Sequence, residues 1–332
     1  MLSGSEVREA IRHELGEEPE SYRASDIGRA HQTFFVQTDS GKYVLKVSED
    51  DERFQVEAPA IRYLNSECNV AVPELMGFDN SKNRFDFMYF ITGFELGENI
   101  DSFEAESGPK FRYLSVERKK NLLNSAGRNL GRIHCQAGFD SFGTFYSDEN
   151  SLEFKEKMSW PELFRKIIIE EQVGNFPERF QDLKNIVKDF VGENINVVDG
   201  VSSPCLVHQD VRWPNMKVQG KTVSTIFDWE RSISGHHEYD LFKAEESLIQ
   251  VRSDGLDEKY RQHFLKGYRK HMDLDTGWKQ RRDFYLAVRP VEALWTFDGW
   301  TDGMSEDRKD EMAEVKRSEL KERIERYREK YS

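Results

Sequence analysis

The sequence predicts an α+β protein of two lobes, with a small antiparallel sheet in residues 1–94 and a mostly helical remainder in residues 95–332. β-rich runs separated by turns crowd into the first lobe, which is the pattern of antiparallel hairpins. Beyond them, apolar residues recur at helical spacing through several long segments. A chain of 332 residues with 37% hydrophobic and 33% charged residues has the length and composition for such a bilobal globular protein.

The charge and the cysteine content indicate which partners and which cellular location to expect. The formal net charge of −13 repels nucleic acid and anionic membrane surfaces. No apolar run approaches the roughly 20 residues of a membrane span, and the first 16 residues lack the pattern of a secretory signal. The three cysteines are far apart in sequence, which favours reduced thiols. We therefore expect a cytoplasmic protein without nucleic-acid or membrane partners, and the oligomeric state stays open.

The first lobe begins with a helix and continues as strands. Ser3 or Ser5 can cap a helix whose apolar side carries Val7, Ala10 and Ile11, and Gly16 ends it. Two β-rich runs, 31–37 and 43–47, flank a turn at 39–42 and predict a hairpin. A helix through residues 54–64 follows, and then two further strands at 72–75 and 85–91.

Residues 92–97 break the strand pattern and predict the linker between the lobes. Helices dominate the second lobe. A short strand at 205–207 and a hairpin of 216–218 with 223–227 interrupt them. The predicted helices of this lobe span residues 116–137, 158–172, 180–191, 240–251, 259–271, 278–295 and 306–331.

Residues 208–215 read H-x-D-x-x-x-x-N, and the hairpin that follows leads to Asp228-Trp229-Glu230. This set suits phosphoryl transfer from a nucleotide. One carboxylate can accept the proton of an attacking hydroxyl, while an amide and a second carboxylate can hold metal ions that bridge the phosphates. The spacing matches the catalytic loop of protein kinases, but the second aspartate lacks the Phe-Gly that follows it there.

The order of these motifs resembles the aminoglycoside phosphotransferase (APH) family, which has a protein-kinase-like fold. That family carries stretches like L-x-H-G-D-L-x-x-x-N-x-L, I-D-W-E and D-x-x-x-D-L-A, and here residues 206–218, 226–230 and 238–241 take their places. The Leu-Gly-Arg-Ile-His stretch at 130–134 is also similar to the family. The resemblance covers about residues 20–250 and is most specific in the catalytic block.

The resemblance implies roles for the catalytic block. Asp210 would act as the base toward the acceptor hydroxyl, and Asn215 and Asp228 would hold Mg²⁺. His208 and Arg212 would support the catalytic loop, and Asp240 would brace it. Gln209 stands where the family has glycine, so we expect a backbone there that avoids any φ reserved for glycine.

The same resemblance assigns nucleotide and acceptor contacts. Lys46 would contact the α- and β-phosphates with Glu57 as its ion-pair partner, and Gly28 would lie in the loop that covers the phosphates. Thr92 and Phe94 would offer hinge groups to adenine. The residues that would contact the acceptor are Glu230, Trp295 and Asp298. The pair His236-His237 has no third ligand at suitable spacing and is expected to be an exposed loop pair.

The leading hypothesis is a small-molecule kinase that transfers the γ-phosphoryl group of ATP, or of GTP, to a hydroxyl of an aminoglycoside, amino alcohol or sugar-like metabolite. The acidic chain slightly favours a cationic acceptor. One alternative is a catalytically inactive kinase-like module for nucleotide binding or scaffolding. Another is a protein kinase, which the short stretch between Asp228 and Asp240 disfavours because it leaves little room for an activation segment.

Overall fold

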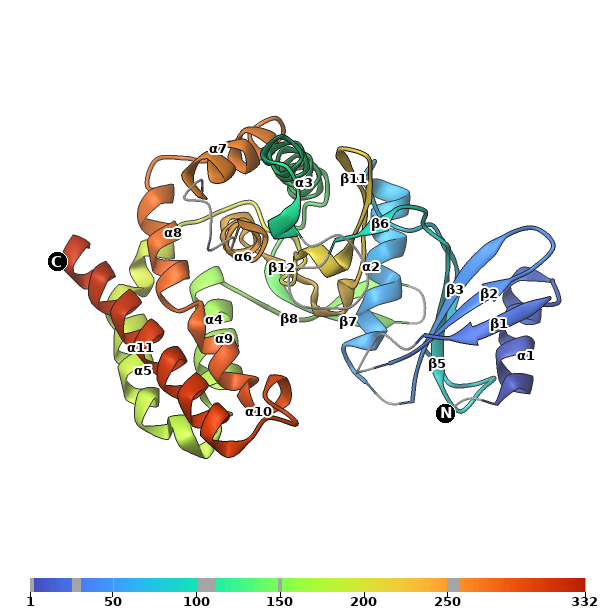
Figure 1. The fold of residues 1–332 in the computed structure, drawn as a ribbon, viewed down its shortest axis with the longest axis horizontal. Coiled ribbons are helices and arrows are strands. Elements are labelled where there is room, and N and C mark those ends of the chain that lie inside the picture. The colour runs from blue at the N-terminus through green and yellow to red at the C-terminus, as the bar shows by residue number, and fades with distance from the viewer. Residues whose placement is uncertain are drawn as a thin grey trace.

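The computed structural model describes residues 3–25, 31–49, 51–100, 111–148, 151–249 and 257–331. A small lobe built on one sheet lies at one end of the molecule, and a larger, mainly helical lobe forms the rest (Figure 1). This arrangement confirms the predicted α+β class. None of the helices in the described ranges combines the length and the apolar character that crossing a bilayer requires.

The small lobe contains a five-stranded antiparallel sheet in the order β1-β2-β3-β5-β4. Side chains alternate between its two faces, as in any strand. Leu45 and Ile91 face helix α1, whereas Phe90 faces helix α2. The elements of this lobe are α1 (Gly4–Leu15), β1 (Ser21–Ala24), β2 (Gln32–Gln37), β3 (Lys42–Ser48), α2 (Phe54–Glu67), β4 (Leu75–Asp79) and β5 (Met88–Gly93).

Helix α1 begins as predicted, because Ser3 caps it in a capping box with Glu6 and Gly16 ends it in the left-handed conformation. Three details of the sheet differ from the sequence prediction. Strand β1 was not predicted, β4 begins at Leu75 rather than at residue 72, and β5 begins at Met88 rather than at residue 85. Residues 72–74 and 85–87 lie outside the ladders of β4 and β5, although the Glu74 carbonyl still accepts a hydrogen bond from the Gly93 N–H.

The linker region leads directly into the large lobe, because β6 (Glu98–Asn99) pairs with β10 (Met216–Gln219). Two small antiparallel sheets, β11-β10-β6 and β8-β7-β12-β9, lie among the helices of this lobe. Its other strands are β7 (Phe142–Asp148), β8 (Ser151–Met158), β9 (Cys205–Val207), β11 (Thr222–Ile226) and β12 (Ile233–Gly235). Its α-helices are α3 (Val116–Gln136), α4 (Trp160–Arg165), α5 (Lys184–Asn194), α6 (His237–Ile249), α7 (Asp257–Tyr268), α8 (Trp278–Ala287), α9 (Pro290–Trp295), α10 (Phe297–Trp300) and α11 (Glu306–Tyr331).

Three predicted helices of the large lobe are divided. The one predicted at residues 180–191 begins in the 3₁₀ segment η3 (Glu178–Leu183) and continues as α5. Residues 158–172 end strand β8, form α4 and continue as a π-helix, η2 (Lys166–Val173). Residues 278–295 form α8 and α9 with a break before Pro290, which has no backbone N–H to continue the helix. The hairpin β7–β8 was not predicted at all. The remaining short 3₁₀ segments are η1 (Phe111–Tyr113), η4 (Ile195–Val198), η5 (Trp213–Asn215) and η6 (Trp229–Arg231).

Helices α3 and α7 cross at glycines on both sides. A Cβ atom at Gly127 would lie 2.1 Å from the carbonyl oxygen of Phe264, and one at Gly267 would lie 2.0 Å from that of Asn124. No side chain larger than hydrogen fits between two backbones at this separation. Glycine therefore sets how closely α7 packs against α3, the helix that runs beneath the catalytic segment.

Helix α2 packs between the two lobes (Figure 1). Its buried residues, among them Phe54, Ile61 and Leu64, belong to one hydrophobic core that continues through the large lobe. The hairpin β7–β8 packs against the same helix, and Lys155 of β8 pairs with Glu52 across the gap at 2.8 Å. A separate core joins α1 to the opposite face of the sheet.

Candidate active site

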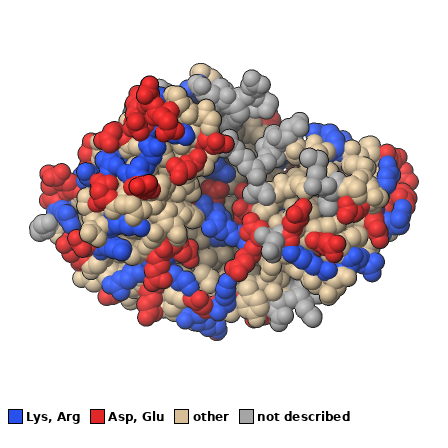
Figure 2. All heavy atoms as spheres, turned by 90° about the horizontal axis from the view of Figure 1, so that it is seen from below, with Lys and Arg blue, Asp and Glu red and all other residues tan. Residues whose placement is uncertain are grey.

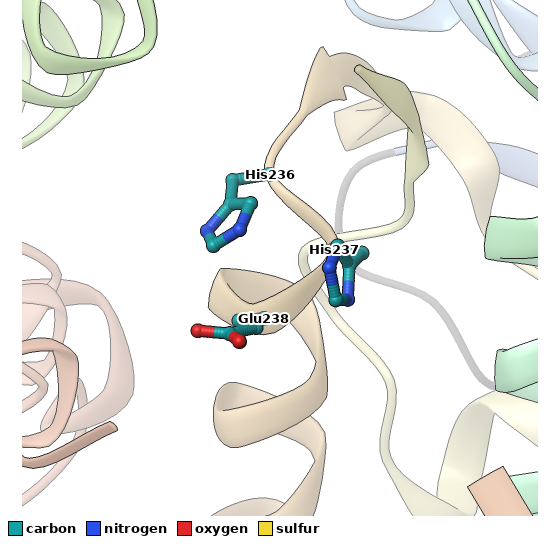
Figure 3. Close-up of side chains that lie close together, drawn as sticks. All are labelled: His236, His237 and Glu238. Carbon is teal, nitrogen blue, oxygen red and sulfur yellow. The ribbon is translucent and has the colours of Figure 1, made fainter. Parts of the chain in front are cut away.

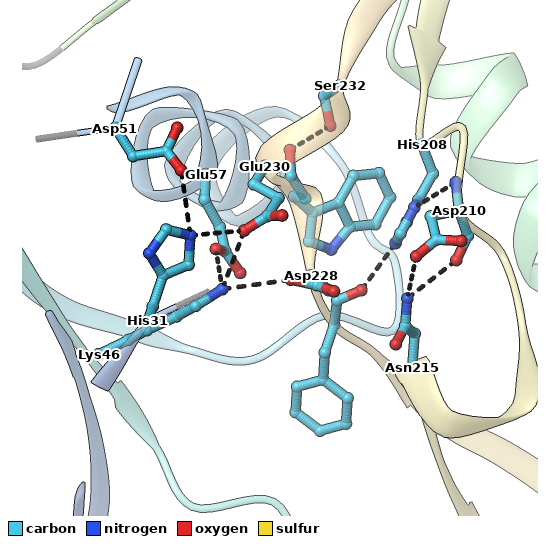
Figure 4. A network of polar contacts seen from close by, with 12 residues as sticks. His31, Lys46, Asp51, Glu57, His208, Asp210, Asn215, Asp228, Glu230 and Ser232 are labelled. Atoms are coloured by element: carbon cyan, nitrogen blue, oxygen red, sulfur yellow. Dashed lines mark hydrogen bonds and ion pairs between the residues drawn. The ribbon is translucent and has the colours of Figure 1, made fainter. Parts of the chain in front are cut away.

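The H-x-D-x-x-x-x-N segment lies between β9 and β10, and its polar groups bond to one another (Figure 4). The Asn215 amide donates to the carbonyl oxygen of Asp210 at 2.9 Å and to its Oδ2 at 3.1 Å. His208 donates from Nε2 to the carbonyl of Phe227 at 2.7 Å, and its Nδ1 accepts from the Asp210 N–H at 3.2 Å. These bonds fix the orientation of the His208 ring and leave the Asp210 carboxylate partly exposed.

Gln209 adopts a left-handed backbone conformation with φ of +65°. The expectation that glutamine at this position would avoid a glycine-type φ is therefore wrong. Two hydrogen bonds hold the residue there: its N–H donates to Asp240 Oδ1 at 2.7 Å, and its side-chain amide donates to the carbonyl of Arg231 at 2.6 Å. The loop keeps the turn that glycine makes easily, and these contacts offset the strain.

Asp240 is fully buried at the start of α6 and accepts the N–H groups of the first two loop residues. Its Oδ2 accepts from the His208 N–H at 2.9 Å and its Oδ1 from the Gln209 N–H. His134 of α3 bonds the same carboxylate at 3.2 Å. Although burial acts to raise the pKa of Asp240, the bonds and charge of His134 and His208 lower it below its ordinary value. The carboxylate thus ties the loop to two helices.

Asp228 reaches the same region because the hairpin β10–β11 folds the chain back. The Phe227 N–H donates to the carbonyl of Asn215 at 2.9 Å, so the end of the hairpin lies against the end of the loop. Asp228 itself has φ of +70°, a conformation that aspartate tolerates better than most residues. One of its carboxylate oxygens, Oδ1, accepts a hydrogen bond from Lys46.

Lys46 of β3 meets three carboxylates from the two lobes (Figure 4). Its Nζ lies 2.6 Å from Glu57 of α2, 3.1 Å from Asp228 and 3.4 Å from Glu230. Burial acts to lower the pKa of Lys46, but the three carboxylates raise it above its ordinary value, so the side chain stays charged. Burial also raises the pKa of Glu57, against the attraction of Lys46. The expected strand-lysine and helix-glutamate pair is present.

Glu230 lies in this ion cluster as well as at the edge of a neighbouring cavity. Its Oε2 accepts a hydrogen bond from His31 Nε2 at 3.0 Å, and Asp51 lies 3.7 Å from the same nitrogen. Partial burial acts to raise the pKa of Glu230, but His31 and Lys46 outweigh it and lower the pKa to about 2. His31 was not singled out from the sequence. A lone histidine at the start of a strand carries no signal until its partner, almost 200 residues later, is placed beside it.

The other residues chosen from the sequence lie at varying distances from this centre. Arg212 is half exposed and pairs with Asp210 Oδ2 at 3.1 Å. Thr92 is buried in β5, and the Phe94 N–H donates to the carbonyl of Lys42 at the start of β3. Gly28 lies outside the described residues.

A cavity of about 330 Å³ opens beside the loop, and we call it the side cavity. It lies among the first turn of α2, the hairpin β7–β8, η2 and α9, and the residues around it include Arg53, Gln172, Gln209, Glu230 and Trp295. The Arg53 guanidinium lies over the Trp295 ring at 5.7 Å. Asp298 is exposed on α10 and is not among the residues that line this cavity.

Two groups of side chains in the described part of the chain have metal-ligand chemistry. One comprises Glu57, Asp228 and Glu230, whose ligand atoms lie within 4.8 Å of one another. Lys46 contacts all three, so the ammonium already balances them. On the side of this cluster that faces the catalytic loop, Asn215 offers an amide oxygen and Asp228 a carboxylate oxygen. Mg²⁺ prefers oxygen ligands of this kind.

The second group comprises His236, His237 and Glu238 (Figure 3). His236 is only 3% exposed, so the expectation of an exposed loop pair is wrong. Arg281 donates to both oxygens of Glu238, at 2.6 and 2.7 Å, and each histidine bonds a tyrosine hydroxyl through Nδ1. Burial lowers the pKa of His237 to about 3. Both Glu238 oxygens and the Nδ1 atom of each histidine are therefore already used within the fold.

Comparison with known proteins supports the same chemistry. The model of the phosphotransferase enzyme family, APH, matches residues 22–284. Comparison with curated proteins gives no match. A candidate fructosamine-3-kinase from Thermobifida fusca YX-ER1 superposes with a TM-score of 0.65 at 15% identity, covering 96% of this chain and all of that one. A candidate aminoglycoside phosphotransferase from Ralstonia eutropha JMP134 has a TM-score of 0.65 at 14% identity and 99% coverage of both chains.

A thermostable mutant of the aminoglycoside phosphotransferase APH(4)-Ia, crystallised with AMP-PNP and hygromycin B, has a TM-score of 0.63 at 14% identity. The superposition covers 96% of this chain and 98% of that one. At such low identities the likeness concerns the fold, and it confirms the predicted bilobal, protein-kinase-like architecture.

Proposed function

Because the chain belongs to the phosphotransferase enzyme family, we propose that it transfers the γ-phosphoryl group of ATP to a hydroxyl of a small molecule. The observation that carries the proposal is the meeting of Lys46, Asp228, Asn215 and Asp210 between the lobes, although they come from three separate parts of the chain. The relative crystallised with AMP-PNP and hygromycin B supports a nucleotide donor and a small hydroxylated acceptor.

The small lobe would hold the nucleotide. Glu57 fixes the Lys46 ammonium at 2.6 Å, so the cation can meet the α- and β-phosphates without a change of position. Thr92 lies near the end of β5 and Phe94 just beyond it, and these hinge residues would contact the base of ATP or GTP, although the Phe94 N–H is already bonded to the Lys42 carbonyl. Gly28 belongs to the segment between β1 and β2 that would cover the phosphates. These assignments follow the order of elements in the family.

Asn215 and Asp228 would hold Mg²⁺. The Asn215 Nδ2 is used by Asp210, and Asp228 Oδ1 is used by Lys46, so one oxygen of each side chain remains for a cation. Bound there, Mg²⁺ would neutralise charge on the phosphate oxygens. Lys46 supplies a second positive charge in the same place, which lowers the cost of gathering three carboxylates and a polyphosphate.

Asp210 would orient the acceptor hydroxyl and take its proton. Arg212 and Asn215 both contact Oδ2, which leaves Oδ1 for the acceptor. His208 supports the loop and takes no part in proton transfer in this scheme, because both of its ring nitrogens are bonded within the fold. Glu230 and Trp295 border the side cavity and would contact the acceptor there, whereas Asp298 faces solvent.

Acceptor-dependent ADP release tests the proposal. Hydroxylated metabolites and aminoglycosides would be screened with ATP and Mg²⁺, with Asp210→Asn as the blank and Asp199→Asn, an exposed aspartate away from the loop, as the matched control. We expect release with the unmodified protein and the control but not with Asp210→Asn. Acceptor-dependent release that persists in Asp210→Asn would contradict the role of Asp210.

An inactive nucleotide-binding module is the second candidate, and ADP release measured together with thermal shift separates the two. A ligand that binds only the folded protein raises the unfolding temperature. If the protein is an enzyme, ATP and Mg²⁺ should raise the unfolding temperature of both the unmodified protein and Asp210→Asn. Only the unmodified protein should then release ADP. A protein kinase is disfavoured, since only η6 and β12 lie between Asp228 and α6.

A further inference from the structure

The side cavity adjoins the catalytic loop through Gln209 and the ion cluster through Glu230. Figure 2 shows side chains of both charges meeting at the hollow between the two lobes. Most of the charged residues around the cavity are already paired. Lys155 pairs with Glu52, Lys166 with Glu156 and Arg231 with Glu292.

One wall of the cavity is the π-helix η2. The Gly174 N–H donates to the carbonyl of Ile169 at 2.9 Å, which is the five-residue step of such a helix. That step places Ile167 and Gln172 on the same side, and both line the cavity. An ordinary α-helix would turn one of them away. π-helical turns are rare and occur frequently at functional sites.

Gln172 is the buried polar group on that wall. Its residue is 3% exposed, yet its Oε1 has no hydrogen-bond partner among the described residues. A buried acceptor without a partner costs stability, and native proteins rarely keep one without a use. Gln172 lines the side cavity, so a rotation of its side chain would bring this oxygen to an N–H or O–H donor of a bound ligand.

Two charges at the cavity have no ion-pair partner within the described ranges, and they have opposite signs. The exposed Arg53 guanidinium lies over the Trp295 ring and forms no ion pair with a described residue, although the Arg53 backbone N–H donates to Asp51, and the exposed Glu171 carboxylate forms no such ion pair either. Partial burial raises the pKa of Glu171, while the positive charges of Lys166 and Arg53 act to lower it. Arg53 and Glu171 are therefore close enough to interact electrostatically. The cavity thus presents one cation, one anion and one hydrogen-bond acceptor.

We propose that the side cavity binds the acceptor and that this acceptor is a hydroxylated zwitterion, an amino acid or an amino-acid conjugate. Its carboxylate pairs with Arg53, and its ammonium meets Glu171 and the Gln172 amide oxygen. The proposal rests on the phosphotransferase function proposed above. A purely cationic acceptor fits this cavity less well, because it would leave the Arg53 guanidinium without a partner and would be repelled by it.

A matched set of acceptors tests the charge requirement. Homoserine carries both charges, 3-aminopropan-1-ol lacks the carboxylate, 4-hydroxybutanoate lacks the ammonium and propan-1-ol lacks both. Longer amino-acid conjugates with a sugar hydroxyl, and aminoglycosides, extend the set. We expect the highest kcat/KM for a zwitterion, measured as ADP release that Asp210→Asn abolishes.

Three variants then assign the contacts. Arg53→Gln and Glu171→Gln should each raise the KM of the zwitterion about tenfold or more, with kcat little changed. Arg53→Gln should leave the KM of the amine unchanged, and Glu171→Gln should leave the KM of the hydroxy acid unchanged. Gln172→Leu should raise KM while keeping or raising the unfolding temperature, since it removes an unsatisfied acceptor. Glu170→Gln, on the exposed side of the same segment, is the control.

The outcomes separate this proposal from the function on which it rests. Preference for amines, hydroxy acids or aminoglycosides, or KM values that none of the three variants changes, would overturn the zwitterion site while leaving the phosphotransferase intact. Absence of Asp210-dependent ADP release with every acceptor would overturn both. Binding of the best zwitterion to the Asp210→Asn variant, measured by calorimetry, gives a readout without turnover. We expect this binding to be lost in the double variant that also carries Glu171→Gln.

Discussion

Replacing Gln209 by glycine and by alanine separates two contributions that this position combines. The left-handed backbone at φ of +65° costs a residue with a Cβ about 1–2 kcal/mol, and glycine avoids that cost. Glycine gives back about 0.4–1 kcal/mol through the greater freedom of the unfolded chain. Gln209→Gly should therefore be about 0.5–1 kcal/mol more stable than Gln209→Ala.

Both variants lose the bond from the side-chain amide to the Arg231 carbonyl, which contributes about 1 kcal/mol. Gln209→Ala should thus be about 1 kcal/mol less stable than the unmodified protein, and Gln209→Gly close to it. Urea unfolding with an unchanged slope measures both. The same two substitutions at Ser318, exposed within α11, should give the opposite order. Alanine as stable as glycine at Gln209 would refute the strain argument.

Three further results are expected. Asp240→Ala removes the acceptor of three buried bonds and should cost at least about 3 kcal/mol of unfolding free energy in urea, with a smaller loss for Asp240→Asn. Gly127→Ala should cost about 1–3 kcal/mol, because its Cβ would meet the Phe264 carbonyl, whereas Gly192→Ala, with open space around it, should be neutral or stabilising. The lowered pKa of Glu230 contributes stability that is present above its unfolded value and is lost as pH falls toward about 2, so Glu230→Gln should flatten the decline of stability between pH 5 and 2.

The elements that the sequence predicts well are those whose signal is local. The capped first helix, helix α3 and the hairpin β10–β11 each carry their own periodicity or turn residues. The spacing of Asp210, Asn215 and Asp228 also identified the part of the site that one continuous segment supplies. Their proximity follows from a short hairpin, which a linear pattern can indicate.

What the sequence could not predict depends on distant partners. The left-handed Gln209 requires Asp240 and Arg231 to hold it, and neither contact is visible from local propensity. The π-helix η2 has the same apolar run as an α-helix, so its extra residue per turn leaves no trace in composition. The pairing of His31 with Glu230 joins residues that are 199 positions apart in the sequence.

The shared core of α2 has a consequence for how the molecule loses its structure. The sheet packs one face on α1 and the other on α2, while α2 also belongs to the core of the large lobe. Unfolding of the large lobe would remove apolar residues that pack against α2, and with them the support of one face of the sheet. We therefore expect the two lobes to denature in a single cooperative transition. A fragment of residues 1–94 alone would expose the outer side of α2 and aggregate.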